Sequence, residues 1–184
     1  MAMQLQDYLH KLASGKLPDP ARLPPVPEAE PGQTQRLVIA GPRGCGKTAL
    51  MLSRAGLVAR QALACLSSAE DTSAPLAEVL CSLAETPVYL DLRRWSGSLL
   101  DLVAATLVSQ LDGHSTGQAL AKEVLSRPVM LLLDHVESLP VGCVETLGAD
   151  LAQWTSPERT TIWAGWQAMP GRALPDWLAH WQQA

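Results

Sequence analysis

From residue 36 onward the chain alternates short apolar runs with stretches of helical periodicity. The runs of strand length lie at 36–40, 87–92, 129–134 and 160–164, and the helical stretches lie at 47–65, 74–84, 97–111, 116–126, 140–154 and 174–183. Strands that alternate with helices predict an α/β fold, a three-layer sandwich in which a parallel sheet of four to five strands is covered on both faces. Residues 129–133 are apolar at every position, as expected of a strand buried on both faces.

The N-terminal part of the chain has a different pattern. Residues 3–13 place Met3, Leu5, Tyr8, Leu9 and Leu12 at near-helical spacing, which predicts a short amphipathic helix. That helix either packs on its own domain or serves as a docking segment for a protein partner. Six prolines follow within residues 17–32, which favours an extended linker. The predicted organisation is therefore a helix over 1–16, a proline-rich linker over 17–32 and one domain over 33–184.

Composition narrows the range of functions. The 184 residues are 47% hydrophobic, enough for a full-sized core, and carry a net charge of -4, which argues against a general electrostatic grip on nucleic acid. The four cysteines form no CxxC pair, so neither a zinc site nor a disulfide framework is indicated, and free thiols fit a cytoplasmic location. No signal-like segment and no bilayer-length apolar stretch is recognised, so we expect no membrane span.

A phosphate-binding motif occupies residues 41–48, with the pattern Gly-x-x-x-x-Gly-Lys-Thr. Its glycines permit backbone angles that let successive amides point at a phosphate, Lys47 brings a cation to the β- and γ-phosphates, and Thr48 offers a hydroxyl to Mg²⁺. The loop follows an apolar strand and precedes a helical pattern, the setting that this motif requires. We expect ATP and Mg²⁺ at this loop, and the cofactor-binding residues predicted there are Gly41, Pro42, Arg43, Gly44, Cys45, Gly46, Lys47, Thr48 and Ala49.

A second acidic motif ends the most apolar strand. Asp134 closes the run 129–133 and is predicted to hold Mg²⁺ together with Thr48, as such an aspartate does in P-loop proteins. The alternative is an aspartate that only caps a turn. Glu137 and His135 are the candidates to orient or deprotonate an attacking water, and a third alternative is that neither does so.

With these motifs in place, residues 33–180 resemble the AAA+/STAND group of P-loop ATPases, and the segment 129–137 is similar to the signature of its NACHT-type members. The resemblance implies a five-stranded parallel sheet with the loop strand central. It also calls for a polar residue after the fourth strand, where Gln167 is nearest, and for an arginine finger, for which Arg159 and Arg172 are candidates by position. A fifth strand and a helical lid are not recognised, so we expect slow hydrolysis or none.

The leading functional hypothesis is an ATP-dependent switch, or an accessory ATPase, in a larger protein assembly. Its rivals are a small-molecule or nucleotide kinase and a scaffold with a vestigial loop. A partner or a second copy is expected at the N-terminal helix or at the tryptophan-rich C-terminal helix, where Trp177 and Trp181 are four residues apart. Arg93 and Arg94 follow the second strand, at the kind of position where α/β sheets bind ligands, although a solvated surface pair is the plainer interpretation.

Overall fold

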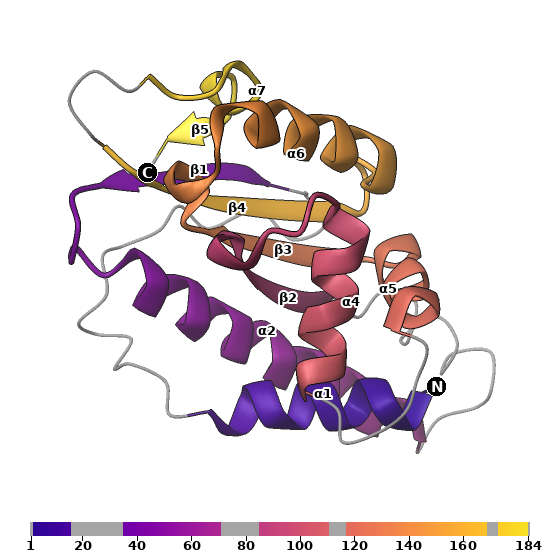
Figure 1. The fold of residues 1–184 in the computed structure, drawn as a ribbon. Coiled ribbons are helices and arrows are strands. Elements are labelled where there is room, and N and C mark those ends of the chain that lie inside the picture. The colour runs from indigo at the N-terminus through magenta and orange to yellow at the C-terminus, as the bar shows by residue number, and fades with distance from the viewer. Residues whose placement is uncertain (1, 16–34, 71–84, 111–116, 169–172, 184) are drawn as a thin grey trace.

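The computed structural model describes residues 2–15, 35–70, 85–110, 117–168 and 173–183 (Figure 1). Its strands are β1 (Arg36–Gly41), β2 (Thr86–Asp91), β3 (Val129–Asp134), β4 (Thr160–Gln167) and β5 (Gln182–Gln183). They form one sheet in the order β2-β3-β4-β1-β5, and every pairing in it is parallel. The predicted α/β class and the parallel sheet of four to five strands are confirmed.

The helices are α1 (Ala2–Ser14), α2 (Lys47–Glu70), α4 (Leu99–Gln110), α5 (Gly117–Ser126), α6 (Val141–Trp154) and α7 (Asp176–Ala179), with single 3-10 turns at Leu92–Arg94 (η2) and Val136–Ser138 (η3). The first five helices and the first four strands match the expected segments to within a few residues. The helix expected over 74–84 and the proline-rich linker over 17–32 lie outside the described residues.

The sheet has two apolar faces because side chains alternate along each strand. Leu37 and Ile39 of β1 join Met130 and Leu132 of β3 and Met51 of α2 in one cluster of buried residues. The intervening residues, such as Val38, Leu131 and Leu133, belong to a second cluster that includes residues of α4, α5 and α6. Figure 1 shows α2 on one side of the sheet and α6 on the other. The result is the expected three-layer sandwich.

The N-terminal helix is part of this domain. Tyr8 and Leu9 of α1 are buried in the larger cluster, and the Tyr8 hydroxyl donates to the Pro87 carbonyl oxygen of β2 at 2.9 Å. Arg60 of α2 donates to the Ala13 carbonyl oxygen at 3.3 Å, which adds a second tie. Of the two interpretations of α1, the structure takes the first, since the domain itself covers its apolar face.

The C-terminal segment corrects two expectations. The helix expected over 174–183 is a single turn that begins after Pro175 and ends at His180, where the backbone leaves helical geometry. Gln182 and Gln183 then pair with Leu37 and Val38 of β1, so the chain does contain the fifth strand that the sequence did not reveal. This pairing satisfies backbone groups at the edge of β1 that would otherwise have no strand partner. In the order β2-β3-β4-β1-β5 the middle strand is β4, so the expectation that β1 would be central was wrong, although β1 is paired on both sides.

The helix α2 has the length and apolar composition of a membrane span, although we expected none. Among the described residues one helix, over Lys47–Ser67, is long and apolar enough to cross a bilayer by those two criteria alone. In the structure its residues Met51, Ala55, Val58 and Ala59 are buried against the rest of the protein. A helix in the core of a domain meets the same two criteria, so this finding by itself does not place the chain in a membrane.

Candidate functional site

The phosphate-loop motif forms a tight turn between β1 and α2. Gly44 and Gly46 have φ angles of 80° and 95°, in the left-handed region that side chains with a Cβ rarely adopt. At Gly41 a Cβ would lie 2.7 Å from the Sγ of the exposed Cys45, so a side chain there would require that thiol to move. Gly44 and Gly46 thus hold the turn in a conformation that favours glycine.

Lys47 is the first residue of α2, and its ammonium group folds back over the loop. The Nζ donates to the carbonyl oxygens of Gly41 and Pro42 at 2.8 and 2.9 Å. Residues 42–45 of the loop are exposed, and Ala49 is half-buried in the first turn of the helix. The loop is therefore open to solvent, with its one lysine cation held above its backbone at the positive end of a 24-residue helix.

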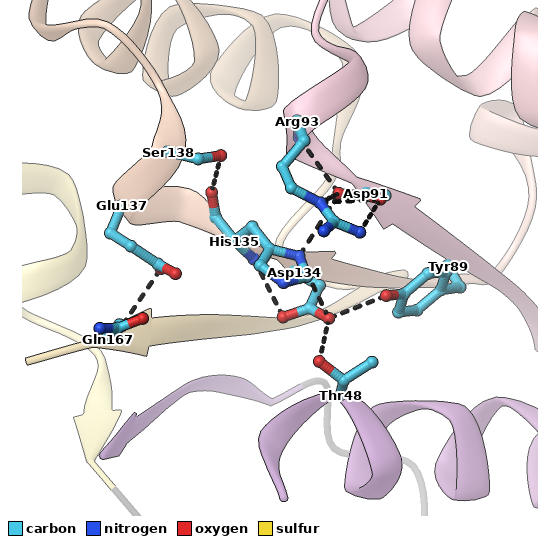
Figure 2. Close-up of polar contacts among 9 residues, drawn as sticks. All are labelled: Thr48, Tyr89, Asp91, Arg93, Asp134, His135, Glu137, Ser138 and Gln167. Carbon is cyan, nitrogen blue, oxygen red and sulfur yellow. Dashed lines mark hydrogen bonds and ion pairs between the residues drawn. The ribbon is translucent and has the colours of Figure 1, made fainter. Parts of the chain in front are cut away.

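Thr48 and Asp134 meet across the sheet, although 86 residues separate them in sequence. The Thr48 hydroxyl donates to the Asp134 Oδ2 at 2.6 Å, and the Tyr89 hydroxyl donates to the same oxygen at 2.8 Å (Figure 2). The Asp134 Oδ1 accepts from the backbone N–H of His135 at 2.9 Å. Asp134 is only 2% exposed, so its charge depends on these donors for stabilisation. A carboxylate and a hydroxyl in contact beside a phosphate loop are the ligands that Mg²⁺ takes in P-loop proteins.

Tyr89 is the residue of this group that the sequence analysis missed. It lies on β2, two residues before the strand ends, and is the one residue of that strand with a phenol. Burial, and then the hydrogen bond to Asp134, raise the pKa of the Tyr89 phenol, so it stays protonated and can donate. The sequence signal was a tyrosine between the apolar residues Val88 and Leu90, but only the sheet order places it beside Asp134.

His135 adopts a strained backbone conformation directly after Asp134. Its φ of 62° is the one positive value at a non-glycine residue among those described. The Nδ1 lies 3.3 Å from the Asp91 Oδ1 and 3.4 Å from the Asp134 Oδ2, yet it is buried without a hydrogen bond of good geometry (Figure 2). Arg93 binds the same Asp91 through Nε and Nη2, and these bonds lower the pKa of the Asp91 carboxyl.

Glu137 lies on η3, on the other side of Asp134 from Tyr89. Its Oε2 accepts from the backbone N–H of Gln167 at 3.1 Å. Gln167 is the last residue of β4 and stands in register with Gly41, the first residue of the phosphate loop. The structure therefore brings Glu137, Gln167 and the loop to one end of the sheet, and it positions Glu137 by its contact with the β4 terminus.

Gly165 of β4 stands beside Asp134, where there is little room for a side chain. A Cβ at this position would lie 3.1 Å from the Asp134 Oδ1 and 3.0 Å from the Met51 Cε. A larger residue would press on the carboxylate that Thr48 and Tyr89 hold. The absence of a side chain here keeps room for Asp134.

The arginine candidates do not join this group. Arg159 precedes β4 and donates to the Ser126 carbonyl oxygen at 3.1 Å, so it lies at the amino ends of the strands, away from the loop. It is the only arginine between β3 and β4, a segment described in full, so the arginine-rich lid that a small kinase needs is not found there. Arg172 lies outside the described residues. Within the described part of the chain no three His, Cys, Asp or Glu side chains gather as a metal site.

Comparison with known proteins adds little to this geometry. No protein-family model matches the chain, and no curated protein matches it. Among solved structures, C. elegans PCH-2 is similar over 97% of this chain and 39% of its own length, with 17% sequence identity and a TM-score of 0.42. The chain thus spans well under half of that protein. A likeness of this degree establishes neither the family nor the function of the chain.

Proposed function

We propose that this chain binds ATP with Mg²⁺ and works as a nucleotide-dependent switch, or as a slow accessory ATPase, within a larger protein assembly. The observation that carries the proposal is the 2.6 Å hydrogen bond between Thr48 Oγ1 and Asp134 Oδ2, at the mouth of a glycine loop that opens a helix. In this proposal Lys47 and the loop amides hold the phosphates, and Thr48 and Asp134 hold the metal.

Bound phosphates would replace hydrogen bonds that Lys47 now makes within the loop. Lys47 now donates to two loop carbonyl oxygens, and a polyphosphate offers its Nζ charged acceptors instead. Residues 42–45 are exposed and can move without disturbing the core. Nucleotide binding would therefore order the loop around the phosphates, and the neighbouring turn at Asp134 and His135 would follow through the metal.

Slow hydrolysis is part of the proposal. Glu137 is the residue that would position water, because its backbone partner Gln167 stands next to the first residue of the loop. His135 is the second candidate, since it is half-buried beside Asp134. Fast turnover usually requires an acidic residue directly after the metal-binding aspartate, and neither Glu137 nor His135 meets that description. The motifs are also the basis on which we propose a relationship to the AAA+/STAND group.

A partner would read the nucleotide state at the C-terminal segment. Trp177 and Trp181 contact one another edge to face, with ring centroids 5.3 Å apart, and both are half-buried. Part of each ring is thus left for another protein, and tryptophan is a frequent anchor at such interfaces. The segment joins the sheet through β5, which pairs with the strand that leads into the phosphate loop.

The test is a titration of the protein with a fluorescent ATP analogue, with and without Mg²⁺, together with mass spectrometry of any nucleotide that co-purifies. The variant Lys47→Ala removes the loop cation, and Lys122→Ala, at an exposed position of α5, is the matched control. We expect ligand at about 100 times its Kd to stabilise the wild type and the control by about 2.7 kcal/mol. If Lys47→Ala melts at the same temperature as the wild type with and without ATP-Mg²⁺, and binds the analogue equally well, the proposal fails.

A further inference from the structure

An open cavity of about 310 Å³, lined by residues of α1, α2, η2, α4 and the end of β2, lies beside the metal-binding carboxylate. Its volume is at the lower end of the range typical of small-molecule sites. None of residues 41–48 lines it, so it is distinct from the phosphate loop. It nevertheless adjoins the loop, since Leu52 on its wall stands one helical turn beyond Thr48.

The α4 wall of the cavity combines apolar and hydroxyl groups on one helix face. Leu102, Thr106 and Ser109 are spaced by four and three residues, so they lie one above the other on that face. Across the cavity stands Leu52, which is 37% exposed although large and apolar. The cavity therefore offers apolar walls to the body of a ligand, and two hydroxyl groups on one side.

Arg94 is the cation on the wall of the cavity that has no carboxylate partner in the part of the chain that the structure describes. Asp91 also lines the cavity, but Arg93 binds both oxygens of its carboxylate. Among the described residues Arg94 has neither an ion pair nor a side-chain hydrogen bond. Arg94 is thus left as an exposed guanidinium without a partner among these residues, a planar group that suits carboxylate and phosphate oxygens.

We infer that this cavity binds a small anionic molecule, with a carboxylate or phosphate group on Arg94, polar atoms toward Thr106 and Ser109, and a short apolar body between Leu52 and Leu102. The site goes beyond nucleotide binding and does not depend on it. Tyr89 lines the same cavity and donates to Asp134, so the ligand would sit against the residue that holds the metal-binding carboxylate.

Phenyl phosphate serves as the main probe, because it joins a phosphate to a compact apolar ring. Benzoate carries a carboxylate on the same ring, and inorganic phosphate is the phosphate group without a ring. Binding is measured by calorimetry and by the change in total tryptophan fluorescence, to which Trp95, the residue after Arg94, contributes. The variants are Arg94→Gln, Thr106→Val, Lys47→Ala and, as a control, Arg127→Gln, which removes an exposed arginine on another face. Circular dichroism verifies that each variant is folded.

We expect phenyl phosphate to bind the wild type, Lys47→Ala and Arg127→Gln alike, with a Kd of about 1 mM. Arg94→Gln should weaken binding roughly tenfold or more, because a hydrogen-bonded charge pair is lost, and Thr106→Val should weaken it by a smaller factor. Binding that survives in Arg94→Gln but is lost in Lys47→Ala would show that the phosphate loop holds the probe, and would overturn the inference. So would the absence of binding by all three probes at about ten times that concentration.

The same samples are titrated with ATP-Mg²⁺, so that the two proposals can fail separately. If phenyl phosphate binds through Arg94 while no variant binds ATP, only the proposed nucleotide function is lost. If ATP binds through Lys47 while no probe responds to Arg94→Gln, only the cavity ligand is lost.

Discussion

The hydroxyl of Thr48 donates to the carboxylate of Asp134 at 2.6 Å, and this contact joins the start of α2 to the end of β3. Thr48 belongs to the phosphate-loop motif, and Asp134 ends a strand that lies 86 residues further along the chain. Their meeting is the condition for a shared Mg²⁺ site, because a metal held by both must lie within reach of each.

Replacing Thr48 with valine, which keeps the shape and removes the hydroxyl, should abolish the Mg²⁺-dependent part of ATP affinity. We expect the Kd for ATP in Mg²⁺ to rise about tenfold or more, and the Kd in EDTA to change little, since the loop amides and Lys47 remain. Titration with a fluorescent ATP analogue measures both constants. Thr146→Val is the control, because that threonine is exposed on α6 and bonds only to its own helix. An unchanged Mg²⁺ dependence would remove Thr48 from the metal site.

Two tyrosine-to-phenylalanine variants should lower the stability of the fold by different amounts, because the two tyrosine hydroxyls donate to acceptors of different charge. Tyr89→Phe removes a donor from the buried Asp134 carboxylate, and Tyr8→Phe removes one from the neutral Pro87 carbonyl oxygen. We expect the free energy of unfolding to fall by about 1.5–3 kcal/mol for Tyr89→Phe and by about 0.5–1.5 kcal/mol for Tyr8→Phe. Urea denaturation of the ligand-free protein measures both. Equal losses would mean that the hydrogen bond from Tyr89 to Asp134 stabilises the fold no more than a bond to a neutral carbonyl oxygen does.

Two glycine-to-alanine variants should change stability in opposite directions. Gly46 has a φ of 95°, so Gly46→Ala should cost about 1–2 kcal/mol and weaken nucleotide binding. Gly142 lies in the first turn of α6, where a Cβ would meet nothing within 4 Å, so Gly142→Ala should add about 0.4–1 kcal/mol and leave nucleotide binding unchanged. Thermal unfolding and the ATP titration report the two effects. A Gly46→Ala protein of wild-type stability would contradict the loop geometry.

Glu85, the residue before β2, should make the stability of the fold depend on pH. Burial raises the pKa of its carboxyl above the ordinary value of 4.5, against the hydrogen bond to Thr161 and the charge of Arg54. The native state then binds more protons than the unfolded state just above that value, so the free energy of unfolding falls as pH rises through the raised pKa. Glu85→Gln should remove this fall, so its stability relative to the wild type should grow from pH 4 toward neutrality. Urea denaturation across this range checks it, with Glu145→Gln on the exposed face of α6 as the control.

Much of the fold followed from local pattern. The runs at 129–133 and 36–40 were apolar enough to require burial, and the glycine spacing of residues 41–48 fixed both the turn and the start of the helix. The C-terminal prediction was wrong because the helical spacing of Trp177 and Trp181 does not reveal how short the helix is or what the residues after it pair with. Pro175 sets where the turn begins, and the open edge of β1 attracts residues 182–183 into the sheet. A strand of two polar residues has no periodicity to recognise.

The sequence by itself determined the class of fold, the phosphate loop and the residue types around it, because these depend on spacing within a short stretch of chain. Only the tertiary structure decided which distant residues meet at that loop. The sheet order puts β3 beside β2, which brings Tyr89 to Asp134, and the register of β1 with β4 sets Gln167, with Glu137 bonded to it, next to Gly41. The packing of α1 and α4 against β2 likewise formed the cavity beside Arg94. Such contacts arise from long-range pairing and close packing, which no local pattern encodes.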